Sequence, residues 1–191
     1  MSRAALLLVV CVSLLAGCGE QPDDPPAVFQ VKVPRGTETA EFAEAGMALE
    51  HPANWRLRRG DAPGVFELLS GEAVVAGWAY PREEPLPEDE ADLEAAKDRL
   101  VEAIEERDPE FRVDSVTVGD VGGAPSIDVR GAQVLGGREL STRSVHVFEG
   151  EVEYVIEALA PPADFDLVEQ QVMAPLLASL ELEGELAEDS G

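Results

Sequence analysis

Four strand-like runs with short turns between them constrain the fold of this chain more than any other feature. The runs are rich in Val, Thr, Ile and aromatic side chains and cover residues 111–118, 126–135, 139–148 and 152–160. Gly136-Gly137 and Glu149-Gly150 separate the later runs, and connections of this length are typical of β-hairpins. The pattern therefore predicts an antiparallel meander.

Shorter strand-like runs precede the meander, at residues 65–69 and 73–80. Alternate residues of the second run are apolar on both faces, which is typical of a strand inside a covered sheet. We expect the large aromatic side chains Trp55, Trp78 and Tyr80 to supply core area. A further alternating run over residues 28–33 predicts an entry strand.

Two stretches have helical periodicity. Residues 89–107 carry apolar side chains at helical spacing and acidic ones opposite, which indicates a helix packed on the sheet by one side. A closing helix follows Pro161-Pro162, and Pro175 must kink it or begin a second short helix. The acidic end, residues 184–191, is expected to be disordered. The element order predicts one α+β domain with an antiparallel β-sheet and helices packed on it.

The turn after residue 51 supports a more specific expectation. An apolar strand running into Pro52-Ala53-Asn54-Trp55 resembles the opening of the PsbP-like (Mog/PsbP-type) domains, and the ending 176–180 is similar to their final helix. The turn Gly122-Gly123-Ala124-Pro125 departs from that pattern, with Pro and Ala in reversed order. The resemblance implies an α/β/α sandwich over residues 38–183, as in small LpqN-type actinobacterial lipoproteins.

The N-terminal segment indicates where the protein resides. Arg3 precedes an apolar run that ends in Leu15-Ala16-Gly17-Cys18, and these four residues resemble the lipobox of bacterial lipoproteins. The resemblance implies that residues 1–17 are a cleaved signal peptide and that Cys18 carries lipid. Residues 18–37 would form a tether with the entry strand. We expect a lipid-anchored protein on the extracytoplasmic side of the cell membrane. An ordinary signal peptide ending in small residues is the alternative.

The charge of the chain excludes some partners. The formal net charge is −25, and it becomes −26 without residues 1–17, which contain one basic residue and no acidic one. Nucleic acids and anionic lipid surfaces attract proteins through positive charge, so we expect neither as an electrostatic partner. We expect a monomer.

Catalytic and metal-binding motifs are missing from the sequence. Beyond the leader the only histidines are His51 and His146, and no Gly-x-Ser-x-Gly, His-Glu-x-x-His or phosphate-binding loop is present. His146 alternates with Ser144 and Phe148 along a strand, which favours a place on the sheet face over a role as a base. Cys11 leaves with the leader and Cys18 is used by lipid. We therefore predict no catalytic residues, no metal site and no cofactor.

Two charged clusters are candidates for binding. Trp55 and the three arginines that follow it, Arg56, Arg58 and Arg59, form a candidate site for an anionic ligand, because guanidinium groups bind carboxylates bidentately. The alternative is an exposed hairpin neutralised by nearby acids. The acidic stretch 83–90 could gather calcium, or it could be a solvated loop before a helix.

These observations favour a lipid-anchored envelope protein with a non-catalytic binding or accessory domain. Its partner would be an envelope protein or a small ligand. A calcium-binding structural module and an envelope hydrolase that uses a carboxylate pair are the alternatives.

Overall fold

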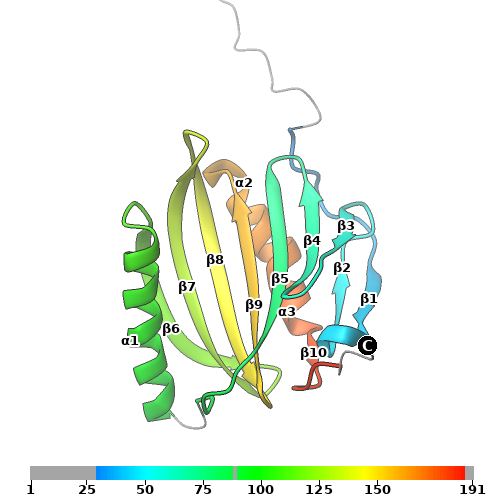
Figure 1. Cartoon of the computed structure of the whole chain (residues 1–191). Helices are drawn as coiled ribbons and strands as arrows, with labels where there is room; N and C mark the ends of the chain where they lie inside the picture. Colours follow the sequence, from blue (N-terminus) through cyan, green and yellow to red (C-terminus); the bar gives the residue numbers. More distant parts are fainter. Residues whose placement is uncertain (1–28, 88–89, 188–191) are drawn as a thin grey trace, which may run out of the picture.

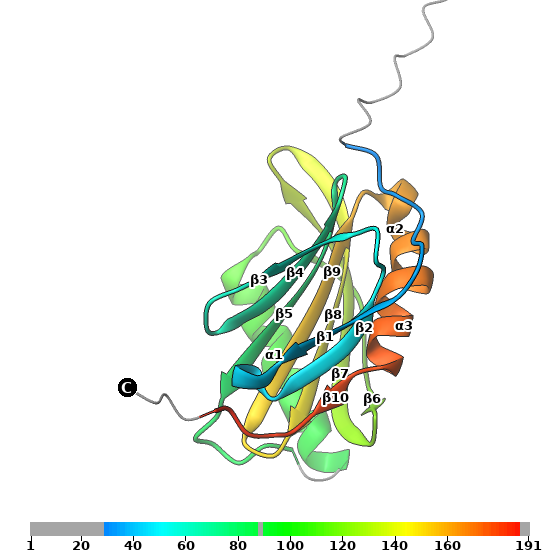
Figure 2. The same ribbon diagram turned by 90° about the vertical axis from the view of Figure 1, so that its right-hand side faces the viewer.

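The computed structural model describes residues 29–87 and 90–187. They form a large twisted antiparallel sheet with helices on both faces and a small second sheet at one side (Figures 1 and 2). The large sheet consists of β3 (Arg56–Arg59), β4 (Gly64–Ser70), β5 (Ala73–Pro81), β6 (Arg112–Val121), β7 (Ala124–Leu135), β8 (Arg138–Glu149) and β9 (Val152–Ala160), in the order β3-β4-β5-β9-β8-β7-β6. The expected α+β class with an antiparallel sheet is confirmed.

The predicted meander is the centre of this sheet. Strands β6 to β9 pair in sequence, each antiparallel to the next, and β9 then pairs with β5. Gly136 and Gly137 join β7 to β8 with φ of 59° and 81°. Positive φ at both positions suits a two-residue hairpin turn that follows the twist of the strands, and side chains other than Gly would be strained there.

One face of the large sheet is covered by the closing helical segment and the small sheet. The segment consists of α2 (Pro162–Val168), a π-helical turn η2 (Glu169–Met173) and α3 (Ala174–Ala178). Pro175 lies in the first turn of α3, so a new helical segment begins there, as predicted. Val168, Met173 and Leu176 are fully buried against Tyr154 and Ile156 of β9.

The small sheet has the order β1-β2-β10, from β1 (Glu38–Phe42), β2 (Met47–His51) and β10 (Glu181–Leu182). A 3-10 turn η1 (Ala43–Ala45) links β1 to β2. Phe42 stacks on Phe66 of β4, with ring centroids 5.4 Å apart. This contact joins the small sheet to the main core.

The opposite face of the large sheet is covered by a single helix, α1 (Glu90–Arg107). Its apolar side, which includes Leu93 and Ile104, packs on Ile127 and Val129 of β7 and on Phe148 of β8. The helix lies toward the β6 side of the sheet (Figure 1), so it leaves the β5 and β9 side of this face less covered. The two faces therefore have separate hydrophobic clusters.

The structure corrects three points about the ends of the chain and the edges of the sheets. Residues 29–33 form no strand, because side chains take their backbone groups: the Ser70 hydroxyl accepts from Lys32 N at 2.8 Å, and Trp55 Nε1 donates to the Lys32 carbonyl at 3.0 Å. The sequence reading also missed the short strands β1 and β3. These have few apolar residues and lie at sheet edges.

The third correction concerns the acidic end. Of its residues, 184–187 are described and hold the small sheet to the β8–β9 turn. Gly184 is buried against Gly150, its carbonyl accepts from Glu151 N at 3.0 Å, and Ala187 N donates to the Glu44 carbonyl at 3.1 Å. Backbone hydrogen bonds order this segment despite its acidic composition.

Candidate functional site

A groove of about 340 Å³ lies between α1 and the less covered part of the large sheet. Its walls come from α1, β5 and the residue before β6, and its floor from β7, β8 and β9. The volume lies within the range of small-molecule sites in proteins. The lining residues that carry polar or aromatic groups are Trp78, Tyr80, Arg82, Arg107, Phe111, Thr142, Ser144, His146, Glu153 and Glu157.

The floor contains a chain of hydrogen bonds centred on Glu153. Its Oε1 lies 2.6 Å from His146 Nδ1, and its Oε2 accepts from Arg82 Nε at 2.7 Å and from Arg82 Nη2. His146 Nε2 lies 3.2 Å from the Ser144 hydroxyl. Burial alone would raise the pKa of Glu153, but the bonds from His146 and Arg82 outweigh it and hold the pKa below its usual range. Glu153 is thus a fully partnered carboxylate.

Glu157 has the opposite electrostatic environment. It lies four residues further along β9 on the same face, and no hydrogen bond or ion pair joins its carboxyl to a residue of the described chain. Burial raises the pKa of Glu157, and the distant charges of Arg107 and His146 offset this only in part. The groove therefore contains one partly buried acid whose partner is missing from the domain itself.

Aromatic rings line the same groove. Trp78 and Tyr80 of β5 and Phe111 before β6 are partly exposed, and the Arg82 guanidinium lies 5.7 Å from the centre of the Tyr80 ring. The expectation that Trp78 and Tyr80 are core residues is wrong. The face of β5 on which they lie is the one that α1 leaves partly open.

The two acids of the groove occupy separate places along β9. Glu153 and Glu157 are four residues apart on one strand, so their Cα atoms are about 13 Å apart. Nowhere in residues 29–87 and 90–187 do three His, Cys, Asp or Glu side chains gather as metal ligands.

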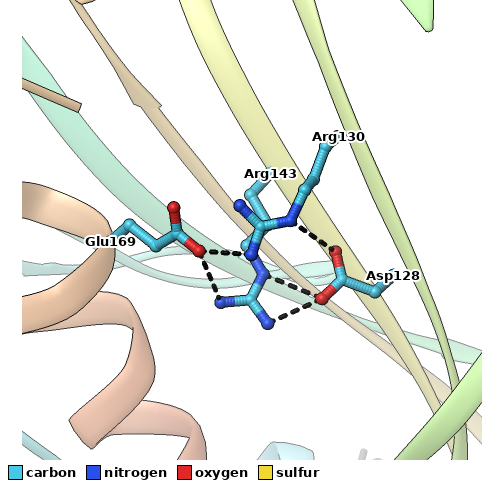
Figure 3. A network of polar contacts seen from close by, with 4 residues as sticks. All are labelled: Asp128, Arg130, Arg143 and Glu169. Carbon is cyan, nitrogen blue, oxygen red and sulfur yellow. Dashed lines mark hydrogen bonds and ion pairs between the residues drawn. The ribbon is translucent and has the colours of Figure 1, made fainter. Parts of the chain in front are cut away.

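A second polar network lies on the other face of the sheet, under η2 (Figure 3). Arg143 of β8 donates to Asp128 Oδ2 from Nε at 2.9 Å and from Nη2 at 2.6 Å, and its Nη1 lies 3.5 Å from Glu169 Oε1. Arg130 Nη2 also donates to Glu169. The bond from Arg130 lowers the pKa of Glu169. Two cations and two anions balance, so this network fastens η2 to the sheet, although Asp128 Oδ1 accepts no hydrogen bond from the described residues and has only Arg130 Nε at 3.9 Å.

The arginines selected from the sequence have different partners, although Arg58 and Arg59 both line a cavity of about 220 Å³. Arg56 and Arg58 alternate with Leu57 on the edge strand β3, and exposed Arg58 pairs with Glu67 at 3.2 Å. Arg59 lies 4.7 Å from the Phe42 ring and donates to the Glu41 carbonyl at 2.8 Å. A cavity of about 370 Å³ lies beside Arg59, but this arginine is already held by those two contacts.

Trp55, the fourth residue of that candidate site, belongs to the core. Only 4% of its surface is exposed, and its indole N–H is bonded to the Lys32 carbonyl. Leu15, Ala16, Gly17 and Cys18 lie outside the described residues, as do positions 88 and 89 of the acidic stretch.

Sequence reasoning placed His146 and Ser144 on a sheet face, as observed, but missed Arg82, Glu153 and Glu157. A signal for the two acids was present. They are the only charged residues in Val152–Ala160 and share one face of an otherwise apolar strand. Acids at such positions face a covered surface, where a carboxylate needs a partner.

No protein-family model matches this chain, and no curated protein matches it in sequence. Solved structures do match. Cyanobacterial PsbP (CyanoP) from Synechocystis sp. PCC 6803 superposes with a TM-score of 0.59 and 8% identity over 76% of this chain and 92% of that one. The domain has a PsbP-like fold.

A second neighbour is LpqN, described as involved in cell envelope biogenesis of Mycobacterium tuberculosis. It has a TM-score of 0.55 and 12% identity over 77% of this chain and 90% of that one. A protein from Bacteroides thetaiotaomicron has a TM-score of 0.50 and 13% identity over 77% of this chain and 49% of that one. At sequence identities this low, the structural matches establish a shared fold alone. The function of this PsbP-like domain must be argued from its own residues.

Proposed function

We propose that this chain is a lipid-anchored cell-envelope protein whose PsbP-like domain binds a small ligand in the α1 groove without catalysing a reaction. Cys18 carries the lipid in this proposal, after cleavage behind Gly17. The lipobox resemblance supports the anchor. LpqN, which shares the fold, is described as acting in cell envelope biogenesis, and this supports the location. None of the helices in the described ranges is long and apolar enough to span a membrane.

The observation that carries the binding proposal is the unpartnered Glu157 in a groove with aromatic walls. Glu157 is partly buried, so its carboxylate is only partly hydrated, and a hydrogen bond from a bound ligand would stabilise it. Glu153 cannot serve in the same way, because His146 and Arg82 already satisfy it. The groove therefore suits a ligand with an apolar or ring portion against Trp78 and a hydrogen-bonding group that meets Glu157.

Mass spectrometry of the protein extracted from its own membranes tests both parts. The intact mass reports whether residues 1–17 are absent and Cys18 is acylated. The native mass spectrum reports small molecules that remain bound. We expect an acylated mature chain with a bound small molecule.

Two substitutions locate the bound molecule. Glu157→Gln keeps the size of the side chain but removes its charge, and Trp78→Ala opens the groove wall. We expect each to raise the Kd at least about tenfold, which corresponds to about 1.4 kcal/mol, and thereby to lower the occupied fraction. The control Glu151→Gln changes an exposed acid in the β8–β9 turn and should leave occupancy unchanged. Equal occupancy in all variants would place the ligand elsewhere and contradict the proposal.

A further inference from the structure

The end of the domain at which the tether arrives carries exposed apolar side chains. Among the described residues, the large hydrophobic ones that are exposed are Phe29, Val33, Val134 and Leu135, with exposed fractions between 46% and 55%. Val134 and Leu135 are the last residues of β7, directly before the Gly136-Gly137 turn. Two large apolar side chains at the tip of this hairpin are therefore exposed to solvent.

Contacts between three segments place these side chains at the same end of the molecule. Arg138, the first residue of β8, pairs with Glu72 in the β4–β5 turn. Gly71 in that turn lies against the backbone of Phe29 and Gln30. Figures 1 and 2 show the β7–β8 hairpin and the start of the described chain at one end, opposite the β8–β9 turn. The tether and the apolar hairpin tip thus face the same direction.

The charges beside the hairpin tip are paired. Arg138 is bonded to Glu72, and Glu139 lies 3.6 Å from Arg112. The two acids next to the turn, Glu72 and Glu139, thus each have a cation beside them. A strongly acidic chain lacks electrostatic attraction to anionic lipid, but an apolar contact does not depend on that attraction.

The chain before Phe29 is short enough to keep this surface close to the membrane. Ten residues, 19–28, separate the candidate lipidation site Cys18 from Phe29. If fully extended they span about 31 Å, and a flexible chain of this length has a root-mean-square span of about 17–19 Å. The anchor holds the tether end within that distance of the bilayer. A tether of this length gives the domain a high effective concentration at the bilayer, so that even a weak contact with lipid is populated.

We propose that the tip of the β7–β8 hairpin, Val134 and Leu135, inserts into the membrane interface and sets the orientation of the domain. Phe29 and Val33 lie beside it at the lipid headgroups. The inference rests on the proposed lipid anchor. The anchor supplies attachment, and the hairpin supplies orientation. In this arrangement the β8–β9 turn and the C-terminal segment point away from the membrane.

A dye at the hairpin tip tests the contact in the lipidated protein. In the mature protein Cys18 is acylated and Cys11 is gone, so Leu135→Cys provides a single free thiol for an environment-sensitive dye. The matched control is Glu151→Cys, an exposed position in the β8–β9 turn at the far end. Both proteins are reconstituted into vesicles of phosphatidylcholine with a minor share of phosphatidylglycerol, with and without brominated acyl chains.

We expect brominated lipid to quench the dye at position 135 at least about threefold more than the dye at position 151. Adding Val134→Ser should reduce the quenching at 135 about two- to threefold, because it removes part of the apolar area that inserts. These positions are exposed, so the melting temperature should change little.

The outcomes separate the inference from the anchor. Vesicle flotation with equal, weak quenching at both positions would overturn the hairpin contact and leave the anchor intact. A protein whose intact mass lacks lipid and that fails to float would overturn the anchor, and the inference with it. Stronger quenching at 151 than at 135 would reverse the proposed orientation and contradict the inference.

Discussion

The two faces of the large sheet have different covers and different charge balance. On one face α2, η2, α3 and the small sheet bury a continuous core, and two arginines, Arg130 and Arg143, balance the charges of Asp128 and Glu169. On the other face α1 covers only part of the surface, and Glu157 lacks a partner within the described chain. The difference indicates that the first face stabilises the domain, and the second face is the one that we propose as the binding face.

The largest effect should come from the packing of the closing helical segment. Leu176→Ala removes a fully buried side chain and should lower the free energy of unfolding by about 2–5 kcal/mol. Leu100→Ala on α1 removes a partly exposed side chain beside the groove and should cost about 1 kcal/mol. Urea unfolding of both variants measures the contrast. Equal losses would show that the α1 face contributes as much to stability as the other.

The second-largest loss of stability should come from the charge network under η2. Arg143→Leu removes one of the two arginines that contact both Asp128 and Glu169, in a site where the side chains of Arg143 and the two acids are 16–20% exposed. We expect a loss of about 2–3 kcal/mol, less than for a fully buried pair.

The matched control is Arg112→Ala. It breaks contacts to Asp114 and Glu139 whose side chains are all more than half exposed. Solvent screens such exposed pairs, so this substitution should lower the free energy of unfolding much less than Arg143→Leu does. A loss for Arg112→Ala as large as that for Arg143→Leu would contradict the assignment of the network to stability.

The smallest effects concern pH and have opposite signs on the two faces. Burial raises the pKa of Glu157 above its ordinary 4.5. Its favourable contribution to the free energy of unfolding is therefore complete below pH 4.5 and is lost as the pH rises through the raised pKa. The bond from Arg130 lowers the pKa of Glu169, so its contribution is present above 4.5 and is lost as the pH falls through the lowered value.

Melting temperatures of two isosteric variants across pH 3–8 measure this contrast. At neutral pH, Glu157→Gln should raise the melting temperature by about 2–4 °C and Glu169→Gln should lower it by a similar amount. Below the ordinary pKa of a Glu both differences should shrink. A lower melting temperature for Glu157→Gln at neutral pH would mean that its carboxylate has a stabilising partner.

The sequence was sufficient for the parts of the fold that local chemistry determines. Gly-Gly turns and apolar alternation specified the meander, helical spacing specified α1, and Pro175 marked the start of α3. The entry segment and the C-terminal end differ because long-range hydrogen bonds to Ser70, Trp55 and Glu44 determine them. The amino-acid composition of a segment does not show which distant residues will form hydrogen bonds with it.

The candidate site was harder to predict than the fold. Its residues come from β5, α1, β8 and β9, and what makes it a site is that α1 covers one part of the sheet and not another. The alternation in β5 placed Trp78 and Tyr80 on one face, as observed, but gave no information on how much of that face a helix would cover. Two acids in an apolar strand were the signal that was available.

The two tryptophans of the chain provide the most direct test of the central claim, because Trp55 is in the core and Trp78 lines the groove. Trp55→Phe leaves only the groove indole, and Trp78→Phe leaves only the core indole. Acrylamide quenching is measured on the membrane-extracted protein before and after bound small molecules are removed. We predict that removal increases quenching of Trp78 and leaves that of Trp55 unchanged. Unchanged quenching of Trp78, with a ligand seen to depart by native mass spectrometry, would contradict the assignment of the groove as the binding site.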